Sequence, residues 1–135
     1  MGDITRTKAN VKGLAGCIYA ASAEAGGTIE AGMAVYLNST NGWKAADGSA
    51  NASLAGLMGV LVSPEDVVDG DKGLSIVIFG RVTGYASMDP GALHFVSNTA
   101  GEIGTAAGTK TKNIGYAETA EILFVQPNAP ANPAA

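Results

Sequence analysis

Short apolar runs separated by glycine and polar turn residues recur along the chain. Each run has the length of a β-strand, and turn signals at a spacing of about 8–12 residues are typical of an all-β sandwich or small barrel. The predicted strands are Ala15–Ala21, Ala34–Leu37, Leu57–Val62, Leu74–Phe79, Val82–Tyr85, Leu93–Val96 and Ile122–Val125.

The strand predicted at Leu74–Phe79 is apolar at nearly every position, which indicates a central strand covered on both faces. No segment has the pattern of a long amphipathic helix. A single helical turn is predicted at Ser63–Val68, with Ser63 as N-cap and Pro64 at the first helical position. We therefore expect a fold that is β throughout apart from this turn.

The pattern of residues 29–42 recurs at residues 88–101, which is an offset of 88 − 29 = 59 residues. Each copy has an acidic residue, a small residue and a glycine before a short strand. A further matched glycine follows in each half, Gly59 in the first and Gly115 in the second. After it, Ile76–Phe79 resembles Ile122–Val125. The repeat predicts two related halves, about residues 29–79 and 88–125, that together form a compact, small barrel-like body.

The repeated glycines have two predicted structural roles. Gly32 and Gly91 would supply the positive φ of a tight turn. Gly59 and Gly115 would allow another backbone to approach closely, or would permit a bulge. All four are predicted as structural residues.

The two ends of the chain differ from the predicted β domain at residues 14–126. Residues 1–13 are mostly polar and are predicted to form an extended arm outside the core. Residues 127–135 form a tail of Pro, Ala and Asn that is predicted to be extended. The first half also has about ten extra residues near Ser63–Lys72, which we interpret as an insertion between strands.

Composition adds an expectation of association. The chain has 135 residues, of which 19 are glycine, 15% are charged and 6% are aromatic. Because large apolar side chains and surface charges are both scarce, we expect the folded chain to bury surface against other protein molecules. The net charge of −4 argues against a nucleic-acid partner, and no apolar run is long enough to span a membrane.

Candidate chemistry is sparse. With Cys17 and His94 as the only residues of their kinds, an internal disulfide and a multi-cysteine metal site are excluded. We interpret His94 as a packed or interface residue and Cys17 as a buried, inert thiol. Asp66–Asp71 lacks the twelve-residue loop of a calcium site and is interpreted as a solvated turn. Trp43 fits a core residue and an exposed interface anchor equally well. We predict no enzyme activity, cofactor or metal.

Three segments carry a family resemblance: Leu-Met-Gly-Val at 57–60, Gly-Leu-Ser-Ile-Val-Ile-Phe-Gly-Arg-Val at 73–82 and Ile-Gly-Tyr-Ala at 114–117. Together with the repeat, over about residues 27–126, the chain resembles the small head-decoration (capsid cement) proteins of tailed bacteriophages, in particular the lambda-like decoration group with a β-clip or β-tulip body. The resemblance implies a homotrimer that is assembled in the host cytoplasm, binds the major capsid protein on the outer surface of the virion and stabilises the shell.

The resemblance also implies an N-terminal arm that orders on the shell. In this chain, Ile4–Lys8 alternates β-prone and basic residues, a pattern suited to strand addition at a sheet edge. The predicted capsid-contact residues are Ile4, Thr5, Arg6, Thr7, Lys8, Val11 and Lys12. The alternative is that the arm has no role.

Two other functions fit the sequence without catalysis. The chain could be a fibre or adhesin subunit, or a β module that binds a ligand. A lipoyl-type carrier would need a lysine at a hairpin tip, for which Lys72 is the candidate, although its neighbours do not fit that pattern.

Overall fold

The computed structural model describes residues 3–21, 23–38, 42–49, 57–63 and 66–127. In this part of the chain, the single helical element is a 3-10 turn, η1, and every other element is a β-strand. The elements are β1 (Thr5–Arg6), η1 (Lys8–Asn10), β2 (Lys12–Gly13), β3 (Ile18–Tyr19), β4 (Ala34–Asn38), β5 (Gly42–Ala45), β6 (Met58–Leu61), β7 (Ile76–Thr83), β8 (Tyr85–Ala86), β9 (Leu93–Val96), β10 (Ile103–Gly104), β11 (Asn113–Ala117) and β12 (Leu123–Val125). The predicted all-β class is confirmed.

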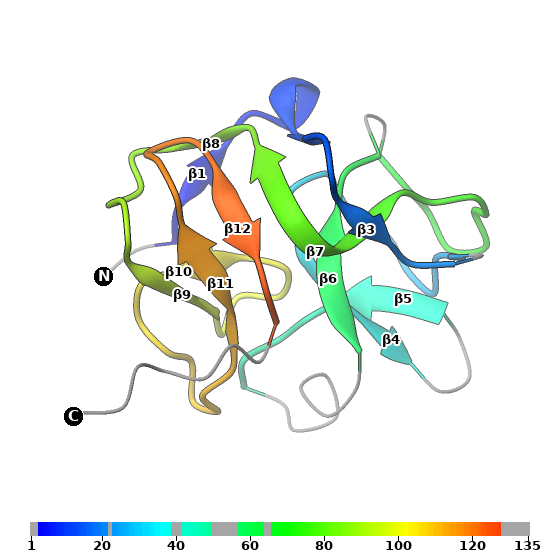
Figure 1. Ribbon diagram of the computed structural model, residues 1–135. Helices are drawn as coiled ribbons and strands as arrows, with labels where there is room; N and C mark the ends of the chain where they lie inside the picture. Colours follow the sequence, from blue (N-terminus) through cyan, green and yellow to red (C-terminus); the bar gives the residue numbers. More distant parts are fainter. Residues whose placement is uncertain (1–2, 22, 39–41, 50–56, 64–65, 128–135) are drawn as a thin grey trace.

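The strands form one curled, half-barrel sheet in the order β10-β9-β11-β12-β7-β6-β4-β5 (Figure 1). All neighbouring strands are antiparallel. Strand β7 lies at the centre, and β2 and β3 also pair with it. A separate short pair joins β1 to β8. The barrel-like body predicted from the sequence is therefore present.

Strand β7 corrects one prediction. The sequence predicted separate strands at Leu74–Phe79 and Val82–Tyr85, but one strand runs from Ile76 to Thr83. It passes through Gly80, which has a φ of 135°. A Cβ atom at Gly80 would lie 2.8 Å from the Cα atom of Cys17. Gly80 therefore lies inside the strand, where it allows the backbone at Cys17 to approach closely, and it does not end the strand.

Other strand predictions also need correction. In the predicted strand Ala15–Ala21, only Ile18–Tyr19 is β-paired. Strands β5 and β11 were not among the predicted strands. The helical turn predicted at Ser63–Val68 is wrong at Val67, which forms a β-bridge with Ile29. Pro64 and Glu65 lie outside the described residues.

The two halves share a turn and two paired strands. In each half the turn glycine has positive φ: 91° at Gly32 and 88° at Gly91. The amide of Gly32 donates to the Leu61 carbonyl at 2.8 Å, and that of Gly91 donates to the Ala117 carbonyl at 2.7 Å. These matched contacts confirm that the repeat produces related structures.

The strand pairing repeats in the same way. Val35 is the register partner of Gly59, and His94 is the register partner of Gly115. A Cβ atom at Gly59 would lie 2.6 Å from the Val77 carbonyl oxygen. At Gly115 the register shifts, and a Cβ atom would collide with the Phe124 carbonyl oxygen. The predicted close approach is therefore observed at both glycines, and a bulge accompanies it at Gly115.

The third strand of the repeat is displaced by one residue from the sequence match. The match aligned Val77 with Leu123. In the structure Val77 pairs with Val60, and the corresponding partner of Tyr116 is Phe124. Val77 is thus equivalent to Phe124. A shift of one residue exchanges the faces of a strand, so the sequence match assigned the wrong neighbours here.

Two clusters of buried residues form the core. The larger cluster includes residues of both halves, and the smaller one lies in the first half around Ile29, Val35 and Trp43. Ile76 belongs to the smaller cluster and Val77 to the larger, so this part of β7 is covered on both faces as predicted. Trp43 is 2% exposed, so of the two interpretations that the sequence left open it is a core residue.

Candidate functional site

Large apolar side chains are exposed where β3, β7, β12 and β11 lie side by side. Ile18 on β3 is 54% exposed, and its register partner Phe79 on β7 is 41% exposed. The ring of Phe79 contacts the ring of Phe124 on β12 edge to face, with centroids 5.1 Å apart. Phe124 is in turn the register partner of Tyr116 on β11. We call Ile18, Phe79, Phe124 and Tyr116 the aromatic strip.

A shallow depression lies at the β11 end of the aromatic strip. It has a volume of about 300 Å³ and is lined by Arg81, Tyr116, Glu118 and Phe124. The Arg81 guanidinium lies over the Phe124 ring, 5.8 Å from its centroid, and pairs with both carboxylate oxygens of Glu118. We call this depression the notch.

In the ion pair at the notch, Arg81 and Glu118 neutralise each other's charge. The hydrogen bond between the two side chains raises the pKa of Arg81 and lowers that of Glu118. Both groups therefore stay charged across the physiological range. An apolar, uncharged ligand suits the notch better than a charged one, since a charged ligand would have to compete with an existing partner.

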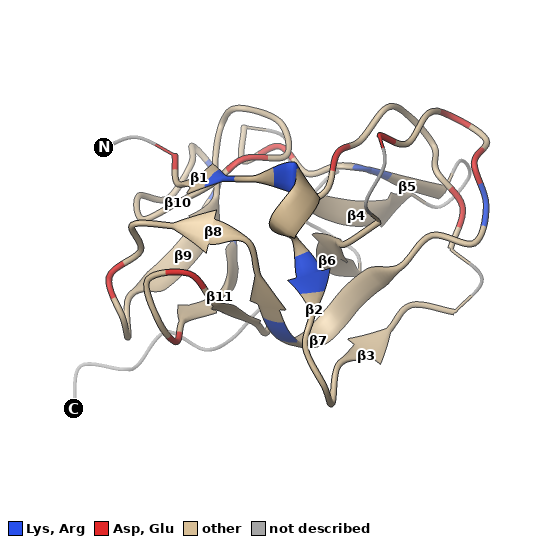
Figure 2. Cartoon of the chain, turned by 90° about the horizontal axis from the view of Figure 1, so that it is seen from above, with Lys and Arg blue, Asp and Glu red and all other residues tan. Residues whose placement is uncertain are grey.

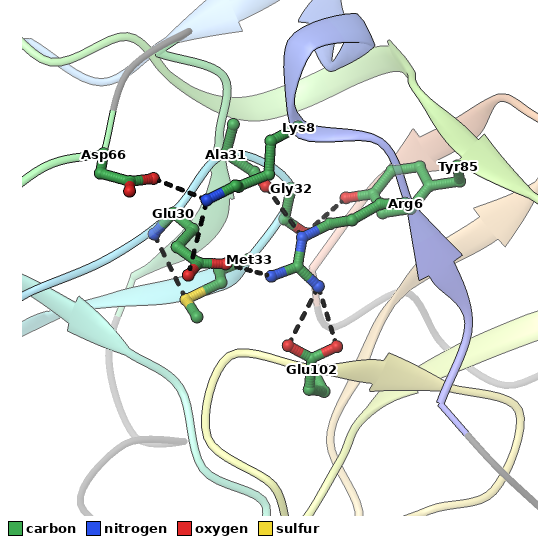
Figure 3. Close-up of polar contacts among 9 residues, drawn as sticks. All are labelled: Arg6, Lys8, Glu30, Ala31, Gly32, Met33, Asp66, Tyr85 and Glu102. Carbon is green, nitrogen blue, oxygen red and sulfur yellow. Dashed lines mark hydrogen bonds and ion pairs between the residues drawn. The ribbon is translucent and has the colours of Figure 1, made fainter.

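A second arrangement of charges holds the N-terminal segment against the body (Figure 3). The Arg6 guanidinium donates to both carboxylate oxygens of Glu102, at 2.8 and 3.0 Å, and to Glu30 at 3.1 Å. Its Nε atom donates to the Ala31 carbonyl at 2.9 Å. Glu30 and Ala31 belong to the turn of the first half, whereas Glu102 follows β9 in the second. Arg6 therefore connects the two halves, and we call these contacts the Arg6 clamp.

Neighbouring groups support the Arg6 clamp. Arg6 pairs in register with Tyr85, whose hydroxyl donates to the Gly32 carbonyl at 2.8 Å. Burial raises the pKa of Tyr85, so the hydroxyl keeps its proton and remains a donor. Lys8 pairs with Asp66 at 2.9 Å and lies 3.8 Å from Glu30.

The N-terminal segment thus differs from the predicted arm. It is extended at β1 and β2, and its basic residues lie along it where it crosses the body (Figure 2). However, Val11 is 3% exposed within the larger core cluster, and Ile4 packs against that cluster. The prediction that these residues lie outside the core is therefore wrong.

Apart from Ile4 and Val11, the predicted capsid-contact residues fall into two groups. The side chains of Arg6 and Lys8 already have acidic partners within the chain. Thr5, Thr7 and Lys12 are exposed. These exposed residues could contact a partner as the segment lies, whereas Arg6 could do so only if the Arg6 clamp opened first. The capsid-contact role of the segment stays a prediction.

The other candidate residues have ordinary surroundings. The Cys17 thiol is partly exposed, unlike the buried thiol that was predicted, and it donates to the Arg81 carbonyl at 3.2 Å. In the Asp66–Asp71 loop, the Asp71 carboxylate accepts the Val68 amide at 3.0 Å, which is a local turn contact. Within the described ranges, no three His, Cys, Asp or Glu residues are grouped so as to hold a metal ion.

Comparison with protein-family models, with characterised proteins and with solved structures finds no match to this chain. Among the residues that the structure describes, no helix has the length and apolarity to cross a membrane. Interpretation of the surface therefore rests on the aromatic strip, the notch and the Arg6 clamp themselves.

The aromatic strip was not predicted from the sequence. The order Phe79-Gly80-Arg81 could have indicated it. Residues two positions apart in a strand share a face, and an arginine is usually solvated, so the face that carries Arg81 and Phe79 would be expected to be exposed. Both side chains in fact approach the Phe124 ring. The interpretation of Leu74–Phe79 as covered on both faces is thus wrong at Phe79.

His94 is fully buried and lacks a partner for one ring nitrogen. Its Nδ1 lies 2.9 Å from the Ala92 carbonyl, and its Nε2 has no hydrogen-bond partner among the described residues. Burial lowers the pKa of His94, although the Ala92 carbonyl and Asp89 oppose this effect. His94 is therefore a packed residue, as predicted, and its equivalent in the first half is the buried Val35.

We expect His94 to make the fold sensitive to acid. Its pKa is near 6.5 when unfolded and lower when folded. As the pH falls below about 6.5, the unfolded chain gains a proton that the folded chain does not, so the free energy of unfolding decreases until the folded pKa is reached. His94→Val should lose less stability between pH 8 and pH 5 than the unchanged chain, as measured by urea unfolding. Equal losses in the two proteins would contradict this assignment.

Proposed function

We propose that this protein is a capsid decoration protein that binds the outer surface of a phage head as a homotrimer and stabilises the shell. The observation that carries the proposal is the aromatic strip on a small all-β body, in which Ile18 and Phe79 are exposed and Phe124 and Tyr116 are half-buried. A chain whose aromatic residues make up only 6% of its length presents three of them side by side at its surface. Such a patch favours contact with another protein.

The remaining features support a binding role without chemistry. Cys17, His94 and the Asp66–Asp71 loop, which were the candidates for reactivity, make contacts that packing and turn formation explain. The resemblance to head-decoration proteins supplies the partner, the major capsid protein, and the threefold arrangement. We place the contact at the Ile18–Phe79 end of the aromatic strip, since Arg6 and Lys8 are engaged within the chain.

The experiment is co-sedimentation with heads of the same phage assembled without this protein. The unchanged chain should sediment with the heads and should run as a trimer alone. Phe79→Ser should reduce occupancy by roughly tenfold or more, because a central aromatic contact contributes about 2 kcal/mol to a protein interface.

Val68→Ser is the matched control, because Val68 is 53% exposed, more than Phe79, but lies in the loop between β6 and β7. This variant should bind like the unchanged chain. A protein that stays monomeric and does not sediment with heads would contradict the proposal. It would favour the fibre or ligand-binding alternatives.

A further inference from the structure

We infer that the notch is a binding site for a proline-rich segment, and that its occupant is the C-terminal tail of the same molecule. The observation is that a notch with aromatic walls and no net charge lies beside β12, the strand from which a proline-rich tail continues. This inference does not depend on the capsid proposal.

The tail has prolines at Pro127, Pro130 and Pro133. In a polyproline II helix, which has three residues per turn, this spacing puts all three rings on one face. Proline-rich segments of this kind bind between aromatic side chains, and they lose little entropy because their conformation is already restricted. The sequence of the tail therefore matches a site walled by Phe124 and Tyr116.

The charge of the notch agrees with this ligand. Arg81 and Glu118 form its polar rim and neutralise each other. Residues 127–135 contain no Lys, Arg, Asp or Glu side chain. An acidic or basic peptide would need to break the ion pair, whereas a neutral proline-rich segment leaves it intact.

The tail begins close enough to reach the notch of its own molecule. Val125 pairs with Gly80, next to Phe79, and the Gln126 amide donates to the Ile114 carbonyl at 2.9 Å on β11. Pro127 lies in a turn. From Pro127 to Pro133 a polyproline II segment extends about 19 Å, and neighbouring strands are about 4.8 Å apart. The notch of the same molecule is thus within reach of the tail.

The test is an NMR measurement on the full chain. We expect the ring protons of Pro130 or Pro133 to be shifted upfield by the aromatic rings and to show contacts to Phe124 and Tyr116. Both signals should persist on dilution. They should be lost in the double variant Pro130→Ala with Pro133→Ala, and also in Phe124→Leu, which keeps an apolar side chain in β12.

The matched control is Ala129→Ser with Ala131→Ser, which changes the same tail away from the proline face. It should keep the shifts and contacts. Proline signals at unstructured positions in the unchanged chain would overturn the inference. Contacts that disappear on dilution would also overturn it, because they would show the tail bound to a second molecule.

Discussion

Arg6→Ala is expected to lower the free energy of unfolding by about 3 kcal/mol, because it removes several charge-assisted hydrogen bonds and leaves the partly buried Glu102 carboxylate without its cation. The Arg6 side chain is 11% exposed, and its loss would leave Glu102 without its partner, whereas Glu30 would keep Lys8 at 3.8 Å. In a domain of this size the loss corresponds to a decrease of roughly 10 °C in Tm. Thermal unfolding followed by circular dichroism measures it.

Lys8→Ala is the control for the Arg6 clamp. Lys8 also forms ion pairs in the N-terminal segment, but its side chain is solvated and its pairs are screened. Its removal should leave Tm nearly unchanged. If Arg6→Ala behaved in the same way, the segment would not connect the two halves.

The second large effect is expected at Gly115. A Cβ atom there would collide with the Phe124 carbonyl oxygen, and it would also lie 3.0 Å from the Gln126 amide nitrogen. Because these atoms belong to the backbone of β12 and the residue that follows it, they cannot move away without loss of the pairing between β11 and β12. Gly115→Ala should therefore destabilise the fold by about 3 kcal/mol, which urea unfolding measures.

Substitutions at two other glycines distinguish the effect of the collision from the effect of backbone conformation. A Cβ atom at Gly91 would meet nothing within 4 Å, but its φ is 88°. Gly91→Ala should cost about 1 kcal/mol through strain alone. Gly27 has open space and no positive φ, so Gly27→Ala should have little effect. A ranking in which Gly115→Ala is as mild as Gly27→Ala would contradict the close approach of β11 and β12.

The local features of the fold were predictable from the sequence. Strands β4, β6, β9 and β12 come from compact apolar runs bounded by turn residues, and their predicted limits differ from the observed ones by one residue at most. The paired glycines were predictable because only a repeated structure needs a glycine at matching positions of both halves. Gly32 and Gly91 indeed have nearly equal φ.

The one-residue displacement of the third strand was not predictable. Ile76–Phe79 and Ile122–Val125 are apolar at every position, so neither run has the alternation that fixes which residues face the core. The register depends instead on the partners: Val60 for Val77, and Tyr116 for Phe124.

The Arg6 clamp and the aromatic strip depend on contacts between distant parts of the chain. Arg6 and Glu102 are 96 residues apart, and the sequence showed the basic residue without its partner. Because that partner was not recognised, Arg6 was predicted to contact the capsid. The exposure of Phe79 likewise depends on which segments cover β7, and an apolar run does not carry that information.

The most direct test of the proposed function is an electron cryomicroscopy reconstruction of decoration-free heads to which the purified protein has been added. We predict added density on the outer surface, with three copies around each threefold position. In each copy, Ile18 and Phe79 should lie within a protein contact. Heads without added density, or bound copies whose Ile18–Phe79 face points to solvent, would contradict the proposal.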